Sequence, residues 1–329
     1  MEAVKVGVIG ITGFGGRIVK AVAEAPELEL ITGFSRTPQS RKELVEEYKC
    51  KEVSSAEGLL GMDEIEAVLI ATPNHMHGEY VIKAAQAGKN VFVDKPITNE
   101  IAEAKECIAA CKEAGVVLQV GHNSRRSGRI RRLKKLIDEG ELGQVIACEA
   151  NNSHAGGLKL TKERWRWYND KCPSGPLMQL GVHCIDTLHY LLGPVKEVSS
   201  FIRKLATPAE IDDTTSTILI FQSGVVGHVG AYYACPSVKR TAVFGTGGNA
   251  YVGANRHILL VRPDRTEEEI ETEQVNTILE EVREFGRCVR EGKRPEVGGE
   301  EALLALAVVR AAIKASQGKR TVTVEEILQ

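Results

Sequence analysis

The chain of 329 residues is too long for one ordinary hydrophobic core, so two domains are expected. It is 43% hydrophobic and 26% charged, which is typical of a soluble globular protein, and no apolar run approaches the ~20 residues that a membrane-spanning helix needs. Its 42 Lys and Arg residues against 44 Asp and Glu residues argue against nucleic acid as a main partner. Eight cysteines without a C-x-x-C pair, and no signal-peptide layout, favour a reduced, cytoplasmic chain.

The first part of the chain alternates apolar strands with helices. The predicted strands cover residues 4–10, 28–34, 66–72, 90–94 and 116–121, and the predicted helices 16–25, 39–48, 79–88 and 100–115. Buried strands that alternate with helices predict parallel βαβ units and a doubly wound sheet, whose ligands bind beyond the carboxyl ends of the strands. The sequence therefore predicts the α/β class, with an N-terminal Rossmann dinucleotide-binding domain over residues 1–122.

The pattern changes after Gly121. Helices are predicted at 129–140, 176–192, 275–291 and 299–317, and strands at 144–151, 214–224, 225–234, 240–252 and 257–262. Alternating apolar and polar residues in these strands indicate an open, mainly antiparallel sheet. Residues 123–329 are therefore predicted to form an α+β domain for substrate binding and oligomerisation. Its open face, with "TILIF" and "VGHVGAYYA", is expected to pair with another copy in a homodimer or homotetramer.

A glycine-rich turn follows the first predicted strand. Its G-x-x-G-x-x-G spacing is a one-residue variant of the dinucleotide fingerprint, and it directly precedes a helix. There the backbone can approach a pyrophosphate, and the helix N-terminus can neutralise it. A tight turn without a ligand is the structural alternative. The expected cofactor contacts in this turn are Gly10, Thr12, Gly13, Phe14 and Gly15.

The second predicted strand ends in Ser35, Arg36 and Thr37. NAD-binding folds usually place an acid here for the ribose 2′-hydroxyl, whereas a 2′-phosphate needs a cation and small donors. Ser35 in place of the acid, with Arg36 beside it, therefore predicts a preference for NADP(H), with NAD(H) possible.

The apolar run "VFVDKPI" ends in Asp94, Lys95 and Pro96, and an earlier strand ends in "ATPNH". A solvated turn is the structural alternative for either strand end. Five segments, in order, carry a family resemblance: "ATPNHMHGEYVIKAAQAGKNVFVDKPIT", "GHNSRRSGRIRRLKKLIDEGELGQV", "SGPLMQLGVHCIDTLHYLLGPV", "DDTTSTILIFQSG" and "FGTGG". Together they resemble the Gfo/Idh/MocA oxidoreductases, the family of glucose–fructose oxidoreductase and inositol dehydrogenase. The resemblance implies hydride transfer between a nicotinamide cofactor and a secondary alcohol or ketone of a sugar, polyol or sugar derivative.

By this resemblance, Lys95 matches the lysine that contacts the reacting hydroxyl or ketone. An ammonium at a strand end can also stabilise developing alkoxide charge, which agrees with that role. His183 matches the family's acid/base histidine, and Asp186, one helical turn later, is expected to fix its tautomer. A structural histidine is the alternative. Gln179 stands where the inositol-dehydrogenase pattern has Asp, which favours Lys95 as the principal acid/base.

The remaining expected contacts complete the predicted site. Further cofactor contacts are expected at Ala71, Thr72, Pro73, Asn74, His77, Asp94, Lys95, Pro96 and Asn123. Substrate contacts are expected at Lys95, Arg126, Asn152, Trp165, Gln179, His183 and Asp186. No set of His and Cys residues has zinc-ligand spacing, so no metal site is predicted. Two alternatives stay open, namely a regulator that senses NADP(H) without turnover and an NAD-assisted glycoside-cleaving relative.

Overall fold

The computed structural model describes residues 2–253 and 257–329, which divide into two compact units. The first unit extends to Asn123 and also takes residues 276–303, and the second contains 124–275 and 304–329. The sequence prediction had kept 123–329 together in one domain. None of the described helices combines the length and apolar character needed to span a bilayer.

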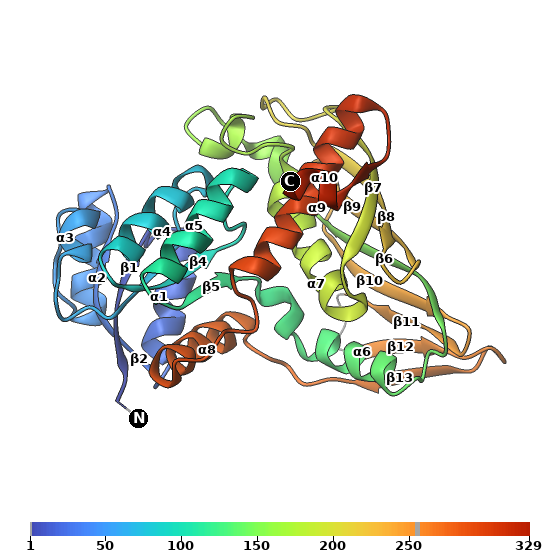
Figure 1. The fold of residues 1–329 in the computed structure, drawn as a ribbon, viewed down its shortest axis with the longest axis horizontal. Coiled ribbons are helices and arrows are strands. Elements are labelled where there is room, and N and C mark those ends of the chain that lie inside the picture. Colours follow the sequence, from blue (N-terminus) through green and yellow to red (C-terminus); the bar gives the residue numbers. More distant parts are fainter. Residues whose placement is uncertain (1, 254–256) are drawn as a thin grey trace. The chain divides into compact units, whose positions relative to one another are not determined.

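The first unit is built on a parallel five-stranded sheet with the order β2-β1-β3-β4-β5. Its strands are β1 (Val4–Ile9), β2 (Leu28–Phe34), β3 (Ala67–Ile70), β4 (Asn90–Asp94) and β5 (Leu118–Gly121). Its helices, labelled in Figure 1, include α1 (Phe14–Glu24), α2 (Pro38–Tyr48), α3 (Ala56–Leu60), α4 (His77–Gln86), α5 (Ile101–Glu113) and α8 (Thr277–Glu291). The strand order reverses between β1 and β3, which is where such sheets bind ligands at their carboxyl edge. The predicted Rossmann sheet is confirmed.

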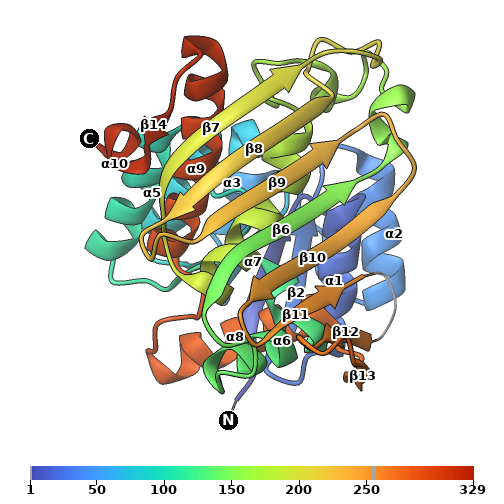
Figure 2. The same ribbon diagram turned by 90° about the vertical axis from the view of Figure 1, so that its right-hand side faces the viewer.

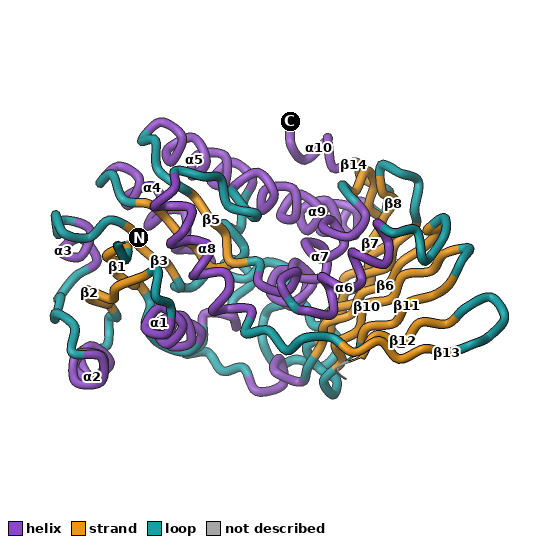
Figure 3. The backbone as a smooth tube through the Cα atoms, turned by 90° about the horizontal axis from the view of Figure 1, so that it is seen from below, coloured by secondary structure: helices purple, strands orange, loops and turns teal. Residues whose placement is uncertain are grey.

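Helix α8 belongs to the first unit because its apolar side is buried against the sheet. Val4, Val6 and Val8 of β1 pack in one core cluster with residues of α1 and with Phe285 of α8. The rings of Phe92 in β4 and Phe285 meet edge to face, with centroids 5.9 Å apart. Helices α4 and α5 pack against each other on the other side of the sheet from α1 (Figure 3). The assignment of this helix to the second domain is therefore corrected.

The second unit is built on a nine-stranded sheet with the order β13-β12-β11-β10-β6-β9-β8-β7-β14 (Figure 2). Its strands are β6 (Val145–Ser153), β7 (Val195–Arg203), β8 (Thr214–Phe221), β9 (Val226–Tyr232), β10 (Val238–Gly245), β11 (Gly248–Val252), β12 (His257–Val261), β13 (Glu267–Glu271) and β14 (Val322–Thr323). Among the described strands of this second sheet, only the β6–β9 pair is parallel. The predicted mainly antiparallel sheet is confirmed.

This sheet differs from the sequence prediction in one hairpin and in three strands that were not predicted, β7, β13 and β14. The predicted strand 240–252 is a hairpin, because the chain turns at Thr246 and Gly247 and pairs Gly245 with Gly248. Strand β7 was not predicted. Strand β13 was also missed, since its sequence EEEIE is almost wholly acidic and lacks the apolar alternation that marks a half-buried strand.

Helices cover one face of the nine-stranded sheet. They include α6 (Gly128–Asp138) and α7 (Val182–Leu192), which follows a π-helical turn at Leu177–Gly181, while α9 (Gly299–Gly318) and α10 (Val324–Leu328) close the chain. No helix of the described chain lies over the opposite face, which is turned to the viewer in Figure 2. That face carries the exposed apolar side chains Phe201, Ile218 and Val226.

The connection between β7 and β8 is held by one buried carboxylate. Asp213 accepts hydrogen bonds from the backbone amides of Leu205, Ala206 and Thr207 and from the hydroxyl of Thr214, with distances between 2.6 and 3.1 Å. Burial raises the pKa of Asp213, but these donors outweigh it and hold that pKa below its ordinary value. The charged form of Asp213 therefore stabilises the folded unit.

The Asp213→Asn variant is expected to lower the free energy of unfolding by about 2–4 kcal/mol, because backbone donors lose a charged acceptor. In the native chain this contribution is present above the unfolded-state pKa of about 4 and is lost as the pH falls through the lower folded-state pKa. Urea unfolding at several pH values measures both effects. Asp212→Asn is the matched control. Burial and the adjacent Asp213 raise the pKa of Asp212, so this variant should be neutral or more stable. Equal losses in the two variants would contradict the assignment.

Candidate active site

The glycine-rich turn joins β1 to α1 and brings two backbone segments together. Gly10 and Gly13 have φ values of +92° and +61°, which favour glycine. A Cβ atom on Gly15 would lie 1.6 Å from the carbonyl oxygen of Gly10, so a side chain there would displace the turn. Helix α1 has no side-chain cap and no acid in its first turn. Its first amides and its positive end are therefore suited to a pyrophosphate.

The end of β2 carries more positive charge than the sequence prediction recognised. Arg36 and Thr37 are exposed, and the amide of Thr37 donates to the hydroxyl oxygen of Ser35 at 3.2 Å. Arg41, in α2, donates to the carbonyl oxygen of Ser35 at 2.6 Å, and its guanidinium lies over the ring of Phe34. Arg41 was missed because it lies inside a predicted helix. The sequence feature that could have identified Arg41 is an arginine in the first turns of the helix that follows β2.

Two buried polar atoms follow β3. The hydroxyl oxygen of Thr72 and the side-chain nitrogen of Asn74 are buried and have no hydrogen-bond partner in the described part of the chain. Buried polar groups are nearly always hydrogen-bonded, so these atoms are suited to a polar ligand. Together with the turn around Gly10, they fit a dinucleotide at the carboxyl edge of this sheet.

His77 links the ends of β3 and β4. Its fully buried ring contacts two carbonyl oxygens, with Nδ1 2.8 Å from Pro96 O and Nε2 2.9 Å from Thr72 O. Burial lowers the pKa of His77, against the effect of the nearby Asp94 carboxylate and of the two carbonyls. His77 therefore fixes the backbone on both sides of the predicted site.

The end of β4 presents Asp94 and Lys95, both partly buried, followed by a cis peptide bond to Pro96. Asn123, just beyond β5, donates from its side-chain nitrogen to the hydroxyl of Thr277 at 3.0 Å. Thr277 is the first residue of α8, so that helix also orients Asn123. The structure thus places the predicted cofactor residues of the first unit at the carboxyl ends of β1 to β5.

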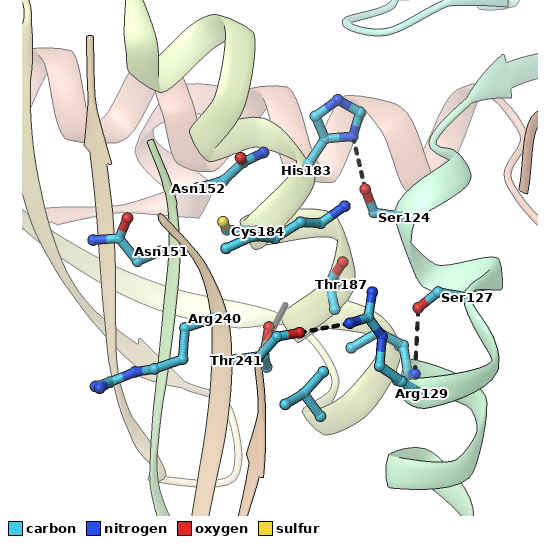
Figure 4. A pocket seen from close by; sticks show the side chains of 14 residues that line it. Ser124, Ser127, Arg129, Asn151, Asn152, His183, Cys184, Thr187, Arg240 and Thr241 are labelled. Carbon is cyan, nitrogen blue, oxygen red and sulfur yellow. Dashed lines mark hydrogen bonds between the residues drawn. The ribbon is translucent and has the colours of Figure 1, made fainter. Parts of the chain in front are cut away.

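In the second unit, α7 carries His183. The ring is partly buried, and its Nδ1 lies 3.3 Å from the hydroxyl oxygen of Ser124 (Figure 4). Asn152 of β6 lines the same hollow as His183 and Ser124. This hollow therefore brings together two of the residues that were predicted to contact the substrate.

Asp186 pairs with arginine. Its two carboxylate oxygens accept from Nε and Nη2 of Arg125, at 2.9 and 2.5 Å, and the two side chains are 1% and 7% exposed. The guanidinium of Arg125 also lies over the ring of Tyr190. Both carboxylate oxygens of Asp186 thus belong to a buried ion pair that the sequence did not predict, and its expected contacts with His183 and with substrate stay predictions.

Gln179 lies in the π-helical turn before α7, so its predicted four-residue spacing to His183 is not that of a regular α-helix. The Gln179 side-chain oxygen accepts from Nε of Arg166 at 3.1 Å, and the guanidinium of Arg166 stacks on Trp165 at 4.5 Å. Arg126, also predicted to contact substrate, is 8% exposed. Gln179 and Trp165 thus form a group around Arg166, which is not among the substrate contacts expected from the sequence.

These features define a protein with a dinucleotide-binding Rossmann sheet and a second unit with a hollow that both polar and apolar residues line. Two sequence models of one family match it. The model described as an oxidoreductase family with an NAD-binding Rossmann fold covers residues 4–122, and the GFO/IDH/MocA C-terminal domain model covers 130–251. The scyllo-inositol 2-dehydrogenase (NAD(+)) of Bacillus subtilis (strain 168) is 32% identical over 258 residues, which are 74% of this chain and 73% of that protein. The chain belongs to the Gfo/Idh/MocA family.

Two further comparisons agree with this family. A crystal structure from Desulfitobacterium hafniense DCB-2, whose description proposes an NADPH-dependent oxidoreductase, is 33% identical with a TM-score of 0.96 over 100% of both chains. The 2,7-anhydro-N-acetylneuraminate hydratase of Escherichia coli (strain K12) is 30% identical over 196 residues, 60% of this chain and 51% of that protein. The chain thus spans about half the length of this relative.

Proposed function

We propose that the protein is an NADP(H)-dependent oxidoreductase that acts on a secondary alcohol or ketone of a sugar, polyol or sugar derivative. The observation that carries the proposal is a partly buried lysine, Lys95, at the end of β4, in the sheet whose turn at Gly10 fits a dinucleotide. Membership of an oxidoreductase family with an NAD-binding Rossmann fold also supports the proposed activity.

The bound nicotinamide would supply the hydride acceptor or donor. The residues of the chain would bind and orient the cofactor and the substrate, and they would move a proton. Gly13, Thr72 and Asn74 would hold the cofactor by backbone and side-chain hydrogen bonds. The ammonium of Lys95 would donate to the reacting oxygen and stabilise its developing negative charge. His183, oriented by Ser124, would bind or exchange a proton with a substrate hydroxyl.

The proposed reaction is tested by incubating the full chain with sugars and polyols and following NADPH absorbance in both directions. We expect cofactor turnover with a subset of these compounds and none with a Lys95→Met control. Complete absence of turnover, with the cofactor bound, would favour a regulator that senses NADP(H).

The preference for NADP(H) is tested at the end of β2. Arg36→Ala is expected to raise the Kd for NADPH by about tenfold and to change the Kd for NADH little, because one charge-assisted contact to the 2′-phosphate is lost. Fluorescence titrations with both cofactors measure this, and Lys42→Ala, an exposed lysine on α2, is the control. A native chain that binds NADH tenfold tighter than NADPH would refute the preference.

A second candidate is a redox-neutral reaction on a sugar, such as hydration or cleavage of a glycosidic bond. It is favoured by the similarity to the relative named 2,7-anhydro-N-acetylneuraminate hydratase. Product formation that requires bound cofactor, without net change in NADPH absorbance, separates this candidate from a dehydrogenase.

The open face of the nine-stranded sheet supports self-association as part of the same proposal. Phe201 is 72% exposed there, with Ile218 and Val226 also exposed, and apolar side chains grouped on a surface favour an interface. We therefore expect a homodimer or homotetramer. A cytoplasmic location is proposed separately, from the eight cysteines without a C-x-x-C pair.

A further inference from the structure

The second unit contains a small hollow next to His183 (Figure 4). It is formed by the start of α6, the first half of α7 and strands β6, β10 and β11. Its volume of about 40 Å³ is enough for a few water molecules or one small substituent, and too small for a whole sugar ring. The polar residues that the argument uses are Ser124, Arg129, Asn152, His183 and Lys239.

The charge of this hollow is positive. Lys239 and Arg129 both line it, and no Asp or Glu is among its described lining residues. Arg240 lines it too, but Figure 4 shows its side chain directed away from Thr187. Its guanidinium forms an ion pair with Glu149 on β6. Lys239 forms no hydrogen bond or ion pair with any residue of the described ranges. The hollow thus offers a cation without a counter-charge.

The surroundings of Lys239 also favour an anion at this hollow. Lys239 as a whole residue is open to solvent, yet burial of its ammonium and the neighbouring Arg129 lower its pKa. Arg129 is held in place by a hydrogen bond from Nη1 to the carbonyl oxygen of Gly253 at 2.6 Å. Two cations kept close together repel each other, and an anion placed between them relieves that repulsion.

The walls of the hollow supply further polar groups. Asn152 adds a side-chain amide, and Ser124 adds the hydroxyl that pairs with His183. Helix α6 begins at Gly128 after the capping residue Ser127, so its positive end also lies at this hollow. Cations, an amide and a hydroxyl suit the oxygens of an anion better than an apolar group.

We propose that this hollow receives an anionic substituent of the carbohydrate substrate, a carboxylate or a phosphoryl group, and that Lys239 is the residue that binds it. The inference rests on the proposed function, since it assigns the charge of that substrate. It places the anionic substituent in the same hollow as His183, so the substrate would be a sugar acid or a sugar phosphate.

The test compares charged and uncharged ligands of matched shape by isothermal titration calorimetry on the full chain with bound NADPH. D-Glucuronate and D-galacturonate probe a carboxylate, and their methyl esters are the uncharged partners. Glucose 6-phosphate and galactose 6-phosphate probe a phosphoryl group, and the free sugars are their uncharged partners. We expect one charged class to bind about tenfold or more tighter than its uncharged partners, as a charge-assisted hydrogen bond gives. The class that does so identifies the anion.

Lys239→Met should remove this difference, and Lys239→Arg should keep most of it. Lys204→Met is the matched control, since Lys204 is an exposed lysine of the same unit outside the hollow. Circular dichroism verifies that each variant is folded. Equal affinity for charged and uncharged ligands in the native chain, or an unchanged difference in Lys239→Met, overturns the inference.

A turnover assay on the same ligands separates the two proposals. If charged ligands bind through Lys239 but none is oxidised or reduced, the proposed function fails and the anion site stands. If only neutral sugars are turned over, and with equal KM in Lys239→Met, the proposed function stands and the anion site fails. If charged sugars are turned over, Lys239→Met should raise their KM about tenfold with little change in kcat.

Discussion

Replacing Lys95 by methionine is expected to lower kcat by about a thousandfold while leaving the Kd for NADPH within about threefold of the native value. Methionine has a similar length but no charge, so the variant removes the group proposed to stabilise the reacting oxygen. The residues proposed to hold the cofactor, around Gly10, Thr72 and Asn74, are unchanged in this variant. Steady-state kinetics with the best substrate of the sugar screen, and a fluorescence titration with NADPH, measure the two effects separately.

Two further variants make this experiment decisive. Lys112→Met removes an exposed lysine from α5 of the same unit and should keep native kcat and Kd. Lys95→Arg keeps the charge but changes its shape and reach, so a partial recovery is expected. Near-native turnover in Lys95→Met would show that another group stabilises the charge on the reacting oxygen. Loss of NADPH binding in the same variant would show that the main role of Lys95 is to bind the cofactor.

Removing one partner of the buried Arg125–Asp186 pair is expected to lower the free energy of unfolding by about 3–5 kcal/mol. Asp186→Ala takes away the carboxylate that binds Nε and Nη2 of Arg125, while the guanidinium stays buried. The pair joins the short helix after β5 to α7, so the loss should also loosen the orientation of His183. Urea denaturation of the full chain, followed by circular dichroism, measures the loss.

The matched control is an aspartate in an exposed ion pair. Asp138 pairs with Lys134 on α6, and Asp138→Ala should cost no more than about 0.5 kcal/mol because solvent screens such pairs. The double variant Arg125→Met/Asp186→Leu should be more stable than Asp186→Ala, since no charge is left buried. Similar losses for Asp138→Ala and Asp186→Ala would show that burial does not determine how much the Arg125–Asp186 pair contributes to the free energy of unfolding.

The parts of the fold that follow from local pattern were predictable. Runs such as "LELITGF" and "NVFVD" are apolar and short, and each became a buried strand, β2 or β4. The glycine spacing after β1 predicted a turn that leads directly into a helix, which is where Gly10 and Gly13 lie, whereas the approach to a pyrophosphate stays a prediction. These features depend on residues within about ten positions of one another, which is the range over which periodicity and turn chemistry are informative.

Features that depend on a distant partner were not predictable. Asp186 was expected to serve His183, three residues away, but its partner Arg125 is 61 residues away along the chain. Helix α8 was assigned to the wrong unit because its amphipathic pattern indicates that one face is buried. The pattern does not identify the sheet against which that face packs. Arg41 was missed for a related reason, since only the folded turn brings its guanidinium to the carbonyl of Ser35.

The return of residues 276–303 to the first unit has a consequence for protein engineering. A gene fragment that stops at residue 123 would encode the five strands but omit α8, and the apolar side chains that Phe285 covers would then face water. Such a fragment is expected to aggregate when expressed alone. A chimera meant to exchange cofactor preference between relatives must therefore transplant two separate stretches of coding sequence.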